Sequence, residues 1–100
     1  MTVIPISSEY VPMIRAGTKV STVRSGTRHY FLGQAIIRCE SIAIPIFITN
    51  VVHKRFGQLD ETDALRDGFP SLESLRSALH RFYRPIGCHQ FVTIVEFRRS

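Results

Sequence analysis

Short stretches of alternating apolar and polar residues recur along the chain, and they predict a protein rich in β-strand. The predicted strands cover residues 3–6, 19–25, 34–40, 42–56 and 90–97. The first contains Pro5, which is typical of an edge strand because proline cannot donate a backbone hydrogen bond. The longest changes phase near Thr49 and Asn50, so it is predicted to bend or bulge there. The last has apolar residues on both faces, which favours a buried position.

Helical spacing of apolar residues, together with capping side chains, predicts three helices between these strands. The first covers about residues 8–16 and stops at Gly17, which tolerates the left-handed backbone of a helix end. The second begins with the acidic turn 60–63, and the third follows Ser71 and continues to about Tyr83. The resulting order, β-α-β-β-β-α-α-β, predicts an α+β fold with a curved or closed sheet.

Length and composition limit the architecture. The chain has 100 residues, of which 44% are hydrophobic, so we expect a single domain over residues 1–100 with one core. No apolar run reaches the roughly 18 residues of a membrane helix, and the first residues lack the basic and apolar regions of a signal peptide. We therefore expect a cytoplasmic protein without a membrane segment. Cys39 and Cys88 are predicted to be unpaired thiols.

The distribution of charge suggests an anionic partner. The net charge is +5, and eleven of the thirteen cations are arginines, which suit forked contacts with phosphate. Residues 60–73 are net −4, so the remaining residues carry +9. This asymmetry would concentrate positive potential elsewhere on the surface and attract polyanions. The ordinary alternatives are that the acidic segment keeps the protein soluble or that it binds a protein partner.

The segment from Gly17 to Arg24 holds an ammonium, hydroxyls and a guanidinium, and a basic loop follows it. In that loop Arg28 stands near Tyr30 and Phe31, a combination suited to phosphate contacts and base stacking. Alternatively, Tyr30 and Phe31 are core residues. This part of the chain is therefore the first place to expect a binding site.

Three stretches in the same order and at similar spacing resemble the ASCH domain, a small family related to the PUA fold and linked to RNA metabolism. They are residues 10–24 (YVPMIRAGTKVSTVR), residues 56–69 (FGQLDETDALRDGF), and the segments 71–83 and 92–97 taken together. The resemblance implies a PUA-like α+β fold, in which a small curved β-barrel is flanked by two to three helices. It also implies a cleft that in relatives faces RNA or a modified nucleoside.

One branch of this family is a bacterial 4-acetylcytidine amidohydrolase, to which the chain is distantly similar. Its catalytic set is a Lys and a Thr in the Gly-x-Lys segment and a Glu in the helical segment. Carried over by motif, those roles fall on Lys19, Thr22 and Asp67. The chain departs from the family in two ways, because Asp67 is one methylene shorter than Glu and Val20 stands where the family has Thr after the Lys.

In such a site Thr22 would be the nucleophile, neutral Lys19 its base, and Asp67 an orienting or proton-relay group. Burial or a nearby cation such as Arg24 would lower the pKa of Lys19, whereas a close Asp67 would raise it, so the sequence leaves the sign open. On a regular strand Lys19 shares a face with Ser21 rather than with Thr22. Lys19 and Thr22 converge only if Lys19 lies in the turn before the strand or the strand bulges.

Each residue of the trio also has an ordinary structural interpretation. Lys19 can be a surface or phosphate-contacting cation, and Thr22 can be a strand-forming residue. Asp67 can terminate a helix just before Gly68. Likewise Tyr83 can end a helix in the core or line the cleft.

Two functions follow as hypotheses. In the first, the domain binds RNA or a modified nucleoside in a cleft between the Gly17–Arg24 segment and Asp67; the candidate binding residues are Lys19, Ser21, Thr22, Arg24, Arg28 and Tyr83. In the alternative, the trio deacylates 4-acetylcytidine or a related acylated nucleoside. The histidines and cysteines lack the spacing of metal ligands, and no phosphate-cradling glycine loop is present, so we expect neither a metal nor a cofactor. The sequence predicts no oligomeric state.

Overall fold

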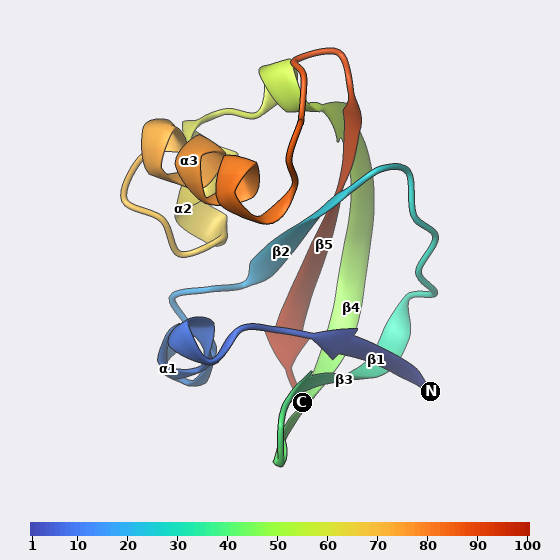
Figure 1. Ribbon diagram of the computed structural model, residues 1–100. Coiled ribbons are helices and arrows are strands. Elements are labelled where there is room, and N and C mark those ends of the chain that lie inside the picture. The colour runs from blue at the N-terminus through green and yellow to red at the C-terminus, as the bar shows by residue number, and fades with distance from the viewer.

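The computed structural model describes residues 1–100, and five of its segments form one curled sheet (Figure 1). The strands are β1 (Thr2–Pro5), β2 (Ser21–Ser25), β3 (Gly33–Cys39), β4 (Ile42–Arg55) and β5 (Phe91–Arg99). Their order across the sheet is β1-β3-β4-β5-β2. Only β1 is paired in parallel, with β3, and the other neighbours are antiparallel. The predicted α+β fold with a curved sheet is confirmed, and the strand containing Pro5 lies at an edge as expected.

The long strand β4 is responsible for much of the curl. Residues 42–48 of β4 pair with β3 and residues 46–55 pair with β5, and the register with β5 shifts between Ile48 and Asn50. A bulge adds a residue on one side of a strand pair and increases the local bend and twist. The predicted break near Thr49 and Asn50 is therefore confirmed, and it lets one strand serve both halves of the sheet.

The helices lie beside the curled sheet, with α2 and α3 together at one end and α1 at the other (Figure 1). They are η1 (Ser8–Tyr10), α1 (Val11–Ala16), η2 (Phe56–Gln58), α2 (Glu61–Arg66) and α3 (Leu72–Phe82), of which η1 and η2 are single 3₁₀ turns. The side chain of Asp60 accepts a hydrogen bond from the Asp63 amide at 2.9 Å, and Ser71 accepts one from the Ser74 amide at 3.1 Å. These caps satisfy amides that have no partner inside a helix, so α2 and α3 begin where the sequence predicted.

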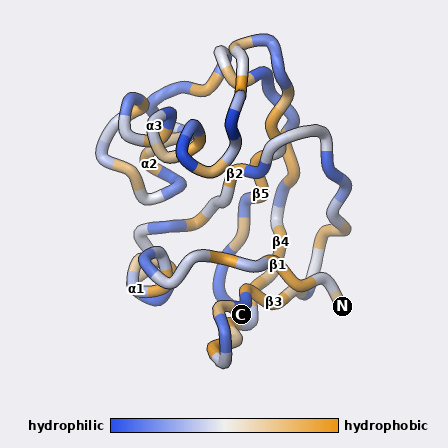
Figure 2. Tube along the Cα trace, in the orientation of Figure 1, coloured by the Kyte–Doolittle hydropathy of each residue, from blue (hydrophilic) through white to orange (hydrophobic).

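Two apolar clusters fill the space between the sheet and the helices. The first holds 11 buried residues, among them Ile4, Ile14 and Ile46, from β1, α1, β3, β4 and β5. The second holds 9, among them Leu75 and Leu79 of α3 packed against β2 and β5. In Figure 2 hydrophobic residues recur along the strands of the sheet, with hydrophilic residues between them. The strand β5 contributes to both clusters, as its two apolar faces predicted.

The two edge strands, β1 and β2, are not paired with each other. Instead Arg24 in β2 donates from Nη2 to the backbone carbonyl of Pro5 in β1. One side chain therefore connects the two edges of the sheet where the backbone does not.

Both cysteines are free thiols, as predicted, with Cys39 buried and Cys88 exposed. No helix is both long enough and apolar enough to span a membrane.

Candidate functional site

Lys19 lies in the turn between α1 and β2. The helix α1 ends at Gly17, whose φ of 81° is left-handed, and the amides of Thr18 and Lys19 both donate to the Met13 carbonyl, at 3.0 and 3.1 Å. The strand β2 begins only at Ser21. Of the two arrangements that would bring Lys19 and Thr22 together, the structure has the turn.

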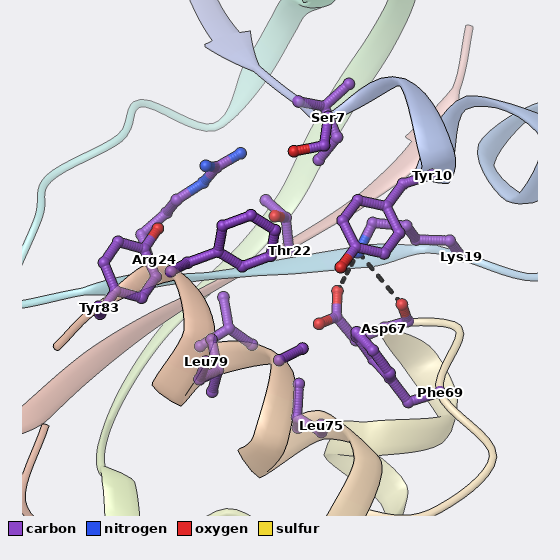
Figure 3. A pocket seen from close by; sticks show the side chains of 14 residues that line it. Ser7, Tyr10, Lys19, Thr22, Arg24, Asp67, Phe69, Leu75, Leu79 and Tyr83 are labelled. Atoms are coloured by element: carbon purple, nitrogen blue, oxygen red, sulfur yellow. Dashed lines mark hydrogen bonds and ion pairs between the residues drawn. The ribbon is translucent and has the colours of Figure 1, made fainter.

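Asp67 reaches Lys19 from the opposite direction, at the C-terminal end of α2. The amide of Asp67 donates to the Asp63 carbonyl at 3.2 Å, and the end of α2 is joined to the Lys19 turn because Val20 donates to the Arg66 carbonyl at 2.7 Å. The ammonium of Lys19 donates to the Asp67 backbone carbonyl at 3.1 Å and also to the Asp67 carboxylate (Figure 3). The shorter carboxylate therefore still makes contact with the lysine.

This ion pair is almost completely removed from water. The side chains of Lys19 and Asp67 are 2% and 5% exposed, and the ring of Tyr10 lies 5.0 Å from the ammonium. A cation over an aromatic face is stabilised by the ring, but burial still penalises both charged forms. The pair thus combines a close contact with a large desolvation cost.

Desolvation determines the direction of both pKa shifts. Burial lowers the pKa of Lys19, with a smaller contribution from Arg24, although Asp67 acts in the opposite direction. Burial raises the pKa of Asp67 to about 6, although Lys19 and Arg24 oppose the shift. The sign that the sequence left open is therefore settled by burial. Each partner is displaced toward its neutral form, which makes Lys19 easier to deprotonate than an ordinary lysine.

The ion pair forms one end of a cavity of about 180 Å³. Its lining comes from the chain start, β2, the end of α2 and the helix α3, and nine of the fourteen residues are hydrophobic: Ile6, Ser7, Tyr10, Lys19, Thr22, Val23, Arg24, Asp67, Phe69, Leu75, Ala78, Leu79, Phe82 and Tyr83. In Figure 3 Lys19 and Asp67 occupy one end, Arg24 and Tyr83 the other, and Thr22 lies between them. The cavity is a mainly apolar chamber with charged groups at its ends.

Aromatic rings form much of the wall. The ring of Tyr10 meets that of Phe69 edge-on at 5.9 Å and lies 6.4 Å from that of Phe82, which in turn is 6.5 Å from Tyr83. The rings hold one another in place through these contacts. A flat ligand entering the chamber would meet several aromatic surfaces.

Most of the residues selected from the sequence meet in this chamber, but two do not. Lys19, Thr22, Arg24, Asp67 and Tyr83 line it. Ser21 is fully buried, and it lines a separate cleft with Lys54 and Glu96. Successive side chains on a strand point to opposite faces, so Ser21 and Thr22 are separated by the sheet. Arg28 is exposed and donates from Nε to the Ser25 carbonyl at 2.9 Å, outside the chamber.

Several lining residues were not among the candidates chosen from the sequence. Tyr10 lies within the predicted helix 8–16, and Phe69 lies between the two later helices. Both become pocket residues because the turn η1 meets the connection between α2 and α3, where their rings are 5.9 Å apart. The helical period of α3 did identify Leu75 and Leu79 as one face, which is the face that closes the chamber. Of the two aromatic residues in the basic loop, Tyr30 packs against the first cluster and Phe31 is 88% exposed.

The overall arrangement is shared with known structures. The ASCH domain from Lactobacillus crispatus JV V101 has a TM-score of 0.82 and 16% identity, and the match covers 98% of this chain and 79% of that one. A protein from Enterococcus faecalis V583 has a TM-score of 0.78 and 14% identity, covering 100% and 76%. A mutant ZmASCH protein from Zymomonas mobilis has a TM-score of 0.68 and 18% identity, covering 96% and 66%.

Sequence comparison alone finds less. No family model matches the chain, and no curated protein matches it. Since the similarity to solved structures extends over nearly all of this chain, it confirms the predicted resemblance at the level of architecture: the chain has the fold of an ASCH domain.

Proposed function

We propose that the chamber binds a modified pyrimidine nucleoside, free or within RNA, with 4-acetylcytidine or a related acylated cytidine as the ligand class. The observation that carries this proposal is that Lys19, Thr22 and Asp67 line one aromatic-walled cavity, although Lys19 and Asp67 are 48 positions apart in the sequence. Small-molecule sites are typically apolar cavities with a few converging polar groups. This chamber has that composition.

The size of the chamber favours a single six-membered ring. An engineered cavity of about 150 Å³ holds a benzene molecule. At about 180 Å³ this chamber has room for a pyrimidine with a small substituent. A purine, with two fused rings, would require the walls to move. Base stacking on aromatic side chains contributes about 1–3 kcal/mol per base, which suits the wall formed by Tyr10, Phe69 and Phe82.

The polar groups suit the edge of a cytosine. Lys19 and Asp67 offer a donor and an acceptor at one end, and the Thr22 hydroxyl makes no hydrogen bond with the other residues drawn in Figure 3. Such a hydroxyl can both donate and accept. A ligand that pairs with it would satisfy a group that the chamber leaves without a partner.

An NMR titration with 4-acetylcytidine, cytidine and adenosine tests this proposal. We expect 4-acetylcytidine to shift the amide signals of Thr22 and Arg24 saturably and adenosine to bind more weakly. Thr22→Val should weaken binding, whereas Thr62→Val, which replaces an exposed hydroxyl outside the chamber by a methyl group, should not. The absence of saturable shifts with every nucleoside would contradict the proposal.

A second candidate function is hydrolysis of the acyl group, because the lysine whose pKa is lowered shares the chamber with Thr22. In this mechanism neutral Lys19 accepts the Thr22 proton, and Oγ1 attacks the acetyl carbon. The bond from that carbon to the exocyclic nitrogen breaks, the nitrogen receives the proton, and water then releases acetate from the Thr22 ester. Asp67 holds the ammonium or amine of Lys19 in position.

Separating cytidine from 4-acetylcytidine by chromatography after incubation tests hydrolysis. Thr22→Ser should retain part of the activity, whereas Thr22→Val and Lys19→Ala should abolish it. The rate should rise with pH as Lys19 loses its proton, and this rise should occur below the ordinary lysine pKa of 10.5. If the protein releases no more cytidine than its Lys19→Ala variant, the chamber binds nucleosides without hydrolysing them.

A further inference from the structure

A second hollow adjoins the chamber at the end away from Lys19. It is a groove of about 610 Å³ that shares Phe82 and Tyr83 with the chamber and continues to the start of β5. Tyr83 and Arg24 both lie at that end of the chamber in Figure 3. A ligand that filled the chamber with its base could therefore extend past Tyr83 into this groove.

The groove differs in charge from the other hollows beside the chamber. Two other hollows share lining residues with the chamber. Each of them is lined by a carboxylate, Glu73 in one and Glu40 in the other. The groove is lined by Arg84 and His89 and by no carboxylate. Among the neighbouring hollows it is thus the one suited to a negatively charged group.

Arg84 is held so that it can bind an anion. Its Nε donates to the His80 carbonyl at 3.0 Å, which fixes the side chain and leaves the terminal nitrogens for a ligand. Two more arginines lie at the rim: Arg28 donates to the carbonyl of Ser25, a groove residue, at 2.9 Å, and Arg55 donates to the carbonyl of His89 at 3.0 Å. The guanidinium of Arg55 also lies 4.8 Å from the ring centre of Phe91, which is 41% exposed.

We propose that this groove is a phosphate subsite, so that the ligand of the chamber is a nucleotide and not a free nucleoside. This inference rests on the proposed function. The chamber has room for a base only, so the ribose and its phosphate must lie outside it. An arginine with free terminal nitrogens is suited to forked contacts with phosphate oxygens. The phosphate comes either from a nucleoside monophosphate or from a single-stranded RNA.

The experiment compares three ligands by NMR titration: 4-acetylcytidine, its 5′-monophosphate, and a trinucleotide with 4-acetylcytidine in the middle. The acetyl methyl signal reports any hydrolysis in the same tube. We expect the monophosphate to bind at least about tenfold more tightly than the nucleoside at about 50 mM salt, and this gain to shrink at about 200 mM salt. If the phosphate belongs to a strand, the trinucleotide binds more tightly still; if it belongs to a free nucleotide, the monophosphate binds as tightly or more tightly.

Arg84→Gln should remove most of the gain from phosphate and leave nucleoside binding unchanged. Arg98→Gln is the matched control, because it removes the same charge from an exposed position near the far end of β5, about 23 Å along the strand from Phe91. Equal binding of all three ligands, or equal effects of the two substitutions, would overturn the subsite while leaving the chamber intact. If the nucleoside itself does not bind, the proposed function fails instead.

Discussion

The contact between Lys19 and Asp67 shows how burial changes the meaning of an ion pair. At a protein surface, water would screen the two charges and their pKa values would move apart, each favouring its charged form. Here both side chains are at most 5% exposed, and desolvation outweighs their attraction. A buried pair of this kind contributes little net stability, but it places a readily deprotonated amine beside a cavity. The arrangement is therefore better suited to ligand chemistry than to stabilising the fold.

The raised pKa of Asp67 predicts an unusual pH dependence of stability. Between about pH 4 and 6 the folded protein carries a proton on Asp67, whose pKa is about 6, and the unfolded chain does not. Unfolding releases that proton, so raising the pH favours the unfolded chain. The contribution of Asp67 to the free energy of unfolding is therefore fully present below about pH 4 and is lost as the pH rises through 6. In urea unfolding, the free energy of unfolding of the wild type should fall by up to about 3 kcal/mol relative to that of Asp67→Asn over this pH range.

The same titration can be followed directly at the carboxyl carbon of Asp67 by NMR. Its midpoint should fall near 6. A midpoint near the ordinary value of 3.8, together with a stability difference that does not change with pH, would show that the carboxylate is more hydrated than its burial indicates.

Removing the lysine should raise the pKa of Asp67 further. Lys19 opposes the effect of burial on Asp67, so Lys19→Met leaves the carboxyl desolvated and without its cation. The carboxyl carbon should then titrate above about 6. Lys54→Met is the matched control, because the second lysine pairs with Asp60 and Asp63 and not with Asp67. A midpoint that moves equally in both variants, or downward in Lys19→Met, would contradict the assignment.

At the scale of elements, the site depends on how closely the end of α2 approaches the turn after α1. Gly68 follows Asp67 with a φ of 86°, and a Cβ there would lie 3.1 Å from Met13 Sδ and 3.2 Å from Lys19 Cβ. Gly68→Ala should therefore cost the left-handed backbone penalty of about 1–2 kcal/mol plus the displacement of both neighbours, roughly 3 kcal/mol in all. Thermal unfolding measures this, at roughly 4–8 °C per kcal/mol for a domain of this size.

Gly26→Ala separates the two contributions. Gly26 has a similar φ of 82°, but a Cβ there would meet nothing within 4 Å. This variant should lose only the backbone penalty, about 1–2 kcal/mol. If Gly68→Ala is no less stable than Gly26→Ala, then α2 and the Lys19 turn are not held together as tightly as these distances imply.

The elements themselves could be predicted from the sequence because their signals are local. A capping serine, an acidic first turn and a change of phase in an apolar run each lie within a few residues, and they placed α2, α3 and the bulge of β4 correctly. The expected position of Ser21 in the cleft was wrong, because no local signal shows which face of β2 a residue occupies. Whether Ser21 or Thr22 faces the cleft depends on the residue at which β2 begins, and strand ends are set by tertiary pairing with β5.

The walls of the chamber depended on contacts that no local pattern contains. Tyr10 and Phe69 meet edge-on although they are far apart in the chain, and α3 has to cover them before a cavity exists. Lys19, Thr22 and Asp67 could be selected together only through the resemblance of their motif to the ASCH family. Residue type alone favoured a solvated or phosphate-contacting position for Lys19.

At the scale of the whole molecule, the chamber lies where the two apolar clusters meet. Leu75 and Leu79 belong to the cluster beneath α2 and α3, whereas Ile6 packs against the cluster that includes β1 and α1, and all three line the chamber. Near this point two polar contacts join segments that are far apart in the chain: the Lys19–Asp67 ion pair and the hydrogen bond from Arg24 to the Pro5 carbonyl. Ligand binding and the closure of the sheet edges are therefore expected to be coupled.

The link between the edge strands can be tested by hydrogen exchange. β1 is a four-residue edge strand whose only partner strand is β3, and Arg24 is the side chain that connects it to β2. Arg24→Met should speed exchange at the Ile6 amide, which donates to the Arg38 carbonyl at 3.0 Å, by roughly tenfold, because a hydrogen bond from a charged donor contributes about 1.5 kcal/mol or more.

Exchange in the pairing of β4 with β5 should not change in this variant, because those strands form the centre of the sheet. Arg28→Met provides the matched control, since it removes the same charge and the only side-chain hydrogen bond of Arg28 is the one to the nearby Ser25 carbonyl, not to β1. Faster exchange throughout the sheet would mean that Arg24 stabilises the fold as a whole. Unchanged exchange at Ile6 would mean that the pairing with β3 alone holds β1, and the end of the chamber at Arg24 would then be independent of the sheet edge.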